Sequence, residues 1–287
     1  MGHLGHLSLI LVMFLGALVV GGGCRKPSIA ERPPEKIIGE RGLGPGQFVF
    51  PRAMATAPDG SLYVVDKTAR VQRFTPDGEY VLGWQLPEWS AGKPTGITVT
   101  RDGRVLVADT HYHRILVYDR DGRELARFGR EGTGPGEFML PTDVEVDAAG
   151  NYFVSEYGGN DRISKFGPDF TFVTTFGGAD AGEARLSRPQ AIKVDETGVL
   201  WVVDSCNHRI CRFSNDGEFL GAFGTDGHAP GQLQYPYDLE LLPDGTILVC
   251  EFGNNRLQRF DRDGRSLEVW GSVGSRPGEL AEPWGMA

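Results

Sequence analysis

The stretch Pro236-Tyr237-Asp238-Leu239-Glu240-Leu241 is followed by Asp244-Gly245 and then by the apolar run Ile247-Leu248-Val249. Alternating polarity predicts a strand with one buried face, and Asp-Gly between two such runs predicts a tight hairpin. The same pattern begins at five further prolines, spaced by 43 to 48 residues, namely Pro51, Pro94, Pro141, Pro189 and Pro283. An internal repeat of this length organises most of the chain.

Each repeat continues in the same order after its second strand. A carboxylate ends that strand, an arginine follows four to six residues later, and a third strand, a second turn and a fourth strand complete the unit. Four antiparallel strands repeated at about this interval are typical of a β-propeller blade. A helical solenoid is excluded, because the repeat lacks the 3.6-residue period of amphipathic helices.

One repeat carries a recognisable family motif. The segment Val203-Asp204-Ser205-Cys206-Asn207-His208-Arg209-Ile210 resembles the motif that names the NHL-repeat family, and drifted copies stand at residues 112–114, 254–256 and 68–70. A Pro-Gly-(Gln/Glu)-(Phe/Leu) element also recurs before the first strand, as at residues 45–48 and 135–138. The resemblance covers residues 36–287 and implies an all-β, six-bladed propeller.

The repeat spacing predicts five complete four-stranded blades and an incomplete sixth. The complete blades are expected at residues 51–93, 94–140, 141–188, 189–235 and 236–282. Residues 36–50, which begin with a lone outer strand at Lys36-Ile37-Ile38, and residues 283–287 are expected to form part of the sixth. By comparison with the fourth blade, about 20 residues of that sixth blade are missing, so we expect either a fragment or an open ring.

The composition agrees with this architecture and limits the function. The 287 residues include 41 Gly and 18 Pro, which serve as turn and loop residues in each blade. A net charge of −9 opposes nucleic-acid binding, since such domains are usually basic. Four cysteines exclude a disulfide framework. Cys206 and Cys211 share a predicted hairpin, so they either pair or act as small buried apolar residues.

The N-terminus predicts export. Residues 7–20 form an apolar run that is short for a spanning helix, and Gly21-Gly22-Gly23-Cys24 follows it. Small residues before a cysteine resemble the bacterial lipobox, in which that cysteine is lipidated. We therefore expect a signal peptide at 1–23, lipidation of Cys24, a tether at 24–35 and anchorage to an envelope membrane. An ordinary cleaved signal and an uncleaved anchor are the alternatives.

The repeated carboxylate and arginine predict a structural contact within each blade. We expect the arginine to hold the loop between the second and third strands, for example by bidentate hydrogen bonds to the carboxylate. A catalytic pair would not be needed five times. The expected pairs are Asp66 with Arg70, Asp109 with Arg114, Glu156 with Arg162, Asp204 with Arg209, and Glu251 with Arg256.

Strand direction predicts where a ligand binds. The first and third strands of a blade run the same way, so the loops that enter them lie at one end of the channel and the Asp-Gly turns at the other. The first end is rich in aromatic and arginine residues, which are favoured in binding interfaces. The candidates are Arg52, His111, Tyr112, His113, Tyr157, Gln190, Tyr237, Phe252 and Trp284. The alternative is that some of them only pack between blades.

The sequence also resembles, distantly, the propeller of the peptidyl-hydroxyglycine amidating lyase. That resemblance implies zinc bound by His just after the proline of several blades, whereas these positions here are Arg52, Thr95, Thr142, Gln190, Tyr237 and Trp284. We assign no catalytic residue, metal or cofactor. The favoured interpretation is a non-catalytic binding or scaffold propeller for a protein, peptide or glycan. A lyase- or lactonase-type enzyme using the channel is the main alternative, and RNA binding, which the net charge opposes, is the third.

Overall fold

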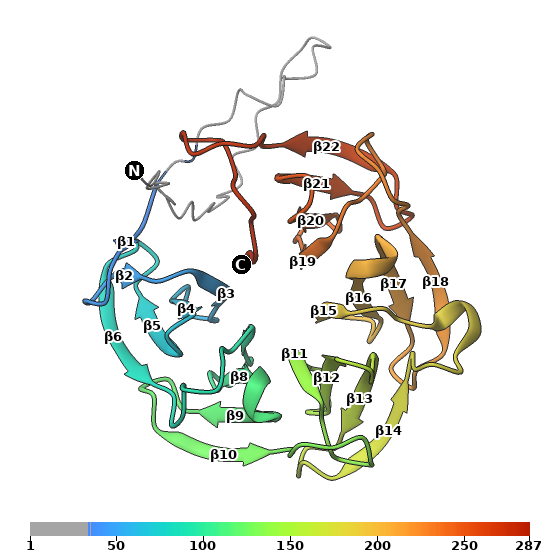
Figure 1. The fold of residues 1–287 in the computed structure, drawn as a ribbon, viewed down its shortest axis with the longest axis horizontal. Helices are drawn as coiled ribbons and strands as arrows, with labels where there is room; N and C mark the ends of the chain where they lie inside the picture. The colour runs from blue at the N-terminus through green and yellow to red at the C-terminus, as the bar shows by residue number, and fades with distance from the viewer. Residues whose placement is uncertain (1–33, 35) are drawn as a thin grey trace.

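The stretches at five of the six repeated prolines form the inner strands of a ring of sheets (Figure 1). The computed structural model describes residue 34 and residues 36–287. Within these residues, five antiparallel sheets of four strands each are arranged around a central channel, and each inner strand lies nearest the axis. The predicted all-β propeller with five complete four-stranded blades is confirmed.

The strands follow the order of the chain. Blade 1 contains β3 (Pro51–Thr56), β4 (Leu62–Asp66), β5 (Arg70–Phe74) and β6 (Tyr80–Gln85). Blade 2 contains β7 (Gly96–Val99), β8 (Val105–Asp109), β9 (Arg114–Tyr118) and β10 (Glu124–Phe128). Blade 3 contains β11 (Leu140–Val146), β12 (Tyr152–Tyr157), β13 (Arg162–Phe166) and β14 (Phe172–Phe176). Blade 4 contains β15 (Pro189–Val194), β16 (Leu200–Asp204), β17 (Arg209–Phe213) and β18 (Phe219–Phe223). Blade 5 contains β19 (Pro236–Leu241), β20 (Ile247–Glu251), β21 (Arg256–Phe260) and β22 (Ser266–Trp270).

Short connections join the strands, and the helices are single 3-10 turns. These are η1 (Thr110–Tyr112), η2 (Gly182–Ala184) and η3 (Ser205–Asn207). The Asp-Gly hairpins form as their sequence predicts: the Gly60 amide donates to the carbonyl of Ala57 at 2.8 Å, and Gly60 adopts a φ of 79°. A left-handed φ carries no steric penalty for glycine, so the turn residue matches the turn. None of the described helices is long and apolar enough to cross a membrane.

The core lies between neighbouring blades. Val65 and Val71 of blade 1 pack with Val107 and Leu116 of blade 2, and all four side chains are fully buried. Burial of a side chain of this size contributes roughly 1.5–3 kcal/mol. Since each blade buries its faces against the next, the interfaces between blades stabilise the ring.

The ends of the described chain differ from the predicted sixth blade. Residues 36–39 do not form a strand, because no strand of the described residues lies beside them to supply ladder hydrogen bonds. Ile38 is nevertheless buried and packs against Gly78 in a turn of blade 1, as Phe176 packs against Gly217 in the turn of the next blade. Ile38 thus takes the place of an outer-strand residue without the strand.

The sheet at this end is a short parallel pair, β1 (Glu40–Arg41) with β2 (Gln47–Phe48). Residues 283–287 also form no strand, and this segment runs towards the channel axis (Figure 1). The Met286 amide donates to the Asp238 carboxylate there at 2.5 Å. The predicted signal peptide at 1–23, Cys24 and nearly all of the tether at 24–35 lie outside the described residues.

Candidate functional site

A β-bulge follows the proline that opens the inner strand of four blades. The register of the inner strand shifts between Pro51 and Ala53, between Pro141 and Asp143, between Pro189 and Ile192, and between Pro236 and Asp238. The residue after each proline is therefore extra relative to the neighbouring strand. A bulge of this kind changes the direction of a side chain without ending the strand.

The six residues that follow the repeated prolines converge. Arg52, Thr95, Thr142, Gln190, Tyr237 and Trp284 all line one small cavity of about 30 Å³ in the channel. The threonines bind the neighbouring blades, since the Thr95 hydroxyl donates to the Thr142 carbonyl at 2.9 Å and the Thr142 hydroxyl to the Pro189 carbonyl at 2.8 Å. Of the other four side chains, those of Gln190 and Tyr237 are buried, and those of Arg52 and Trp284 are partly exposed.

Aromatic rings surround this end of the channel. The rings of Tyr237 and Phe252 are stacked with centroids 4.6 Å apart, and Trp284 meets Tyr237 edge-on at 4.9 Å. The guanidinium of Arg52 lies 3.7 Å from the centroid of the Trp284 ring, within the range of a cation–π contact. Blades 1 and 5 and the segment after blade 5 thus contribute to one cluster.

Tyr157 joins the cluster through an arginine that the sequence analysis missed. The guanidinium of Arg188 lies 5.2 Å from the Tyr157 ring and 5.8 Å from the Tyr237 ring. Arg188 precedes Pro189 and has a φ of 54°. Its place before a repeated proline could have marked Arg188 as a candidate. A residue before proline usually has extended backbone, however, and that rule does not predict the left-handed φ seen here. We call Arg52, Tyr157, Arg188, Gln190, Tyr237, Phe252 and Trp284 the channel mouth.

Three predicted ligand-face residues, His111, Tyr112 and His113, lie in the loop between β8 and β9. The Ala91 amide donates to the Tyr112 hydroxyl at 2.9 Å, and the Lys93 amide to His111 Nδ1 at 3.1 Å. His113 ends η1 with a φ of 55°. None of the three lines the cavity at the channel mouth. These contacts join His111 and Tyr112 to the loop that enters blade 2, and a role of the three residues in ligand binding stays a prediction.

The five predicted carboxylate–arginine pairs all form. The nitrogen–oxygen distances are 2.8 Å for Asp66 and Arg70, 2.8 Å for Asp109 and Arg114, 2.6 Å for Glu156 and Arg162, 2.7 Å for Asp204 and Arg209, and 2.6 Å for Glu251 and Arg256. In every pair the carboxylate side chain is almost fully buried.

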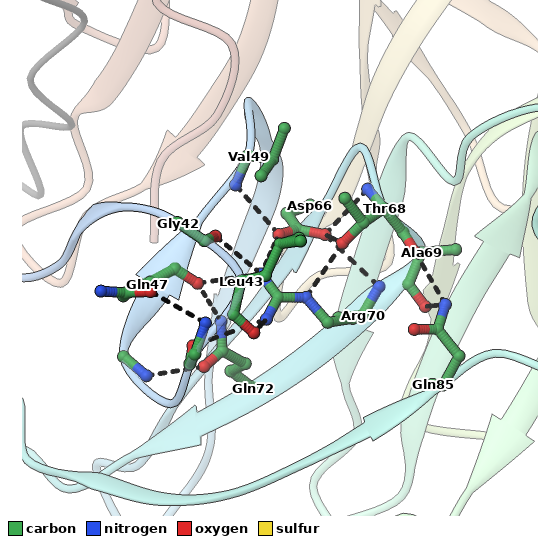
Figure 2. A network of polar contacts seen from close by, with 12 residues as sticks. Gly42, Leu43, Gln47, Val49, Asp66, Thr68, Ala69, Arg70, Gln72 and Gln85 are labelled. Carbon is green, nitrogen blue, oxygen red and sulfur yellow. Dashed lines mark hydrogen bonds and ion pairs between the residues drawn. The ribbon is translucent and has the colours of Figure 1, made fainter.

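Each pair also holds the loop that enters the blade. Figure 2 shows the Arg70 guanidinium bonded once to Asp66, through Nη2, which also donates to the Gln47 carbonyl at 3.0 Å. Its Nη1 donates to the Leu43 carbonyl of the same loop. Asp66 also contacts that loop directly, because its carboxylate accepts a hydrogen bond from the Val49 amide at 3.1 Å. The expected bidentate contact was therefore wrong: the Arg70 guanidinium makes one bond to the carboxylate, because its remaining donors bond to loop carbonyls and to the Thr68 hydroxyl.

Acidic side chains lie deeper in the channel. Lys193 pairs with Glu240 at 2.8 Å, and Asp143 accepts a hydrogen bond from the Ile192 amide at 3.0 Å. Burial raises the pKa of Asp143 and raises the pKa of Asp238 to about 7. No group of three or more His, Cys, Asp or Glu side chains in the described residues is arranged to hold a metal ion.

Known proteins share this repeat and fold. A family model for the NHL repeat matches residues 186–213, and one described as a 6-bladed beta-propeller matches residues 88–156. The chain is a β-propeller that carries an NHL repeat. Residues 186–213 run through the first three strands of blade 4 and include the Asp204–Arg209 pair.

Two curated relatives and one solved structure illustrate the similarity. The propeller is 29% identical to NHL repeat-containing protein 3 of Mus musculus over 166 residues, which is 52% of this chain and 47% of that protein. It is 28% identical to peptidyl-glycine alpha-amidating monooxygenase B of Xenopus laevis over 161 residues, which is 54% of this chain and 16% of that protein. A chain of the nidogen/laminin complex matches with a TM-score of 0.61 and 16% identity, covering 82% of this chain and 83% of the other. At that identity, the structural match shows the fold alone.

Proposed function

We propose that this propeller is a non-catalytic binding module, tethered to a cell envelope, that binds a protein, peptide or glycan at the channel mouth. One observation carries the proposal: the chain gathers three stacked or edge-on aromatic rings and two arginines from separate blades at one end of the channel. Tyrosine, tryptophan and arginine dominate binding energy at protein interfaces. The apolar run at 7–20 and Cys24 support the tether.

The alternative is an enzyme of the lyase or lactonase kind. The similarity to peptidyl-glycine alpha-amidating monooxygenase B favours it, although the matched stretch is only 16% of that protein. Against it, the six residues that follow the repeated prolines include no histidine, and threonines at two of these positions hold neighbouring blades together. The binding function therefore fits these side chains better.

Binding by the full chain to peptide and glycan arrays tests the proposal. Substitution of Phe252 by alanine removes a ring from the channel mouth and should weaken any specific ligand about tenfold or more. The matched control is Arg123→Ala, which changes an exposed residue in a turn at the opposite end of blade 2. Ligands lost equally in both variants, or in the control alone, would contradict binding at the channel mouth.

The enzyme alternative has its own measurement. The full chain is incubated with an α-hydroxyglycine-extended peptide and with a lactone, and its bound metal is quantified. Turnover that depends on stoichiometric metal and stops on chelation would overturn the non-catalytic function. Binding without turnover supports it.

A further inference from the structure

Two guanidinium groups at the channel mouth lack the carboxylate partner that the five loop arginines have. Within residues 36–287, Arg52 and Arg188 form no ion pair, and the Nε atom of each is buried without a hydrogen-bond partner. Their contacts are with aromatic rings, those of Trp284 for Arg52 and of Tyr157 and Tyr237 for Arg188. Ring faces attract a cation but accept no conventional hydrogen bond.

The contrast with the loop arginines is direct. Arg256, for example, bonds to a fully buried carboxylate at 2.6 Å and to three loop carbonyls. In each blade, a buried carboxylate and the entry loop thus supply hydrogen-bond acceptors to the loop arginine. Arg52 and Arg188 have no such acceptors in the described residues. A buried donor left unpaired destabilises a protein, and such a group in a folded structure calls for an explanation.

The acidic groups nearby are already occupied. Asp161 accepts backbone hydrogen bonds from Arg188 and Gly158. Asp238 accepts hydrogen bonds from the backbone amides of Met286 and Leu239 and interacts with the charge of Lys193, which pairs with Glu240. The two guanidiniums thus face the mouth as uncompensated positive charges, and burial lowers the pKa of Arg52.

We propose that the channel mouth binds the side-chain carboxylate of an acidic peptide segment through Arg52 and Arg188, with an aromatic or apolar neighbour of that residue against Tyr237 and Trp284. This inference rests on the proposed binding function and names its ligand chemistry. A planar carboxylate matches the fork of a guanidinium. It carries one negative charge, which suits two cations that lie above an acidic channel better than the greater charge of a phosphate.

A pair of blocked peptides tests the charge requirement. Ac-Ala-Glu-Phe-Glu-Ala-NH2 and Ac-Ala-Gln-Phe-Gln-Ala-NH2 are titrated into the full chain by calorimetry, and their amidated and acetylated ends leave the glutamates as the acidic groups. We expect the glutamate peptide to bind about tenfold more tightly or better, as charge-assisted hydrogen bonds imply. The difference should shrink as salt is raised from 50 to 500 mM, a test that needs no variant.

Variants assign the effect to the two arginines. Arg52→Gln and Arg188→Gln remove the positive charge but keep a polar side chain, and each should remove most of the difference between the peptides, while Arg123→Ala should leave it unchanged. Equal affinity for the two peptides, including the absence of binding by both, overturns this proposal. So does a phosphoserine peptide of the same design that binds more tightly than the glutamate peptide. If the glutamine peptide binds as well and Phe252→Ala weakens it, the channel mouth is still a ligand site and only its charge preference is refuted.

Discussion

Replacing Arg256 by alanine tests whether the repeated pair holds each blade to its entry loop. The Arg256 guanidinium bonds to Glu251 at 2.6 Å and to the carbonyls of His228 at 2.6 Å, Ala229 at 3.2 Å and Gln232 at 2.8 Å. Glu251 is completely buried. Alanine therefore leaves a buried carboxylate without its cation and frees the loop before blade 5.

The expected loss of stability follows from this burial. Breaking a buried ion pair by removing one partner destabilises a protein by roughly 3–5 kcal/mol, because the remaining charge stays buried and uncompensated. The Gln258 amide at 2.9 Å and the Gln234 backbone amide at 3.0 Å still bond to Glu251, so we expect a value near 3 kcal/mol. Adding Glu251→Gln removes the charge and should recover about 1–2 kcal/mol of that loss.

Urea unfolding followed by tryptophan fluorescence measures the loss, and hydrogen exchange at the Gln234 amide reports the loop. The control is Arg259→Ala on the same strand, whose partly exposed pairs with Asp244 and Glu268 should contribute less than about 1 kcal/mol. If Arg256→Ala costs no more than Arg259→Ala, and the Gln234 amide stays protected, the pair does not hold the loop.

Three further results are expected. Burial raises the pKa of Asp238 to about 7 from near 4 in an unfolded chain, so its stabilising effect is complete below pH 4 and is lost as pH rises to 7. Asp238→Asn should therefore reduce the fall in unfolding free energy between pH 5 and pH 8 by at most about 3 kcal/mol, and an unchanged slope would refute this. A Cβ on Gly96 would lie 2.4 Å from the Thr142 carbonyl oxygen, so Gly96→Ala should lower the unfolding free energy by about 1–3 kcal/mol, whereas Gly178→Ala, with open space, should not. Labelling with a fatty-acid analogue should occur in the wild type and disappear in Cys24→Ala, and equal labelling of both would exclude lipidation at that residue.

Local chemistry made most of the fold predictable. The Asp59-Gly60 turn and its counterparts need only neighbouring residues to form, so the hairpins could be placed from the sequence. The pairing of Asp66 with Arg70 was equally local. The outer strand expected at 36–38 does not depend on local residues alone, because a strand exists only where another strand pairs with it.

The channel mouth was predicted in part, for a geometric reason. Arg52, Gln190 and Tyr237 could be expected at one end of the channel, since topology alone brings the starts of the inner strands together. Arg188 could not, because its left-handed backbone before a proline runs against the usual preference. The contact of Tyr112 with the loop that enters blade 2 could not be predicted, because it depends on a single 3-10 turn that repeat spacing does not contain.

The bulge after the opening proline lets one strand both pair with its neighbour and present a side chain to the channel. Residues before and after it make the ladder bonds that a blade needs in order to fold, while the extra residue at positions such as Arg52, Thr142 and Tyr237 makes none of the pairings in register. Its identity is therefore under little constraint from the sheet. Ligand preference in such a ring can therefore change by single substitutions at positions such as Arg52 and Tyr237, without loss of the ladder hydrogen bonds that form the blade.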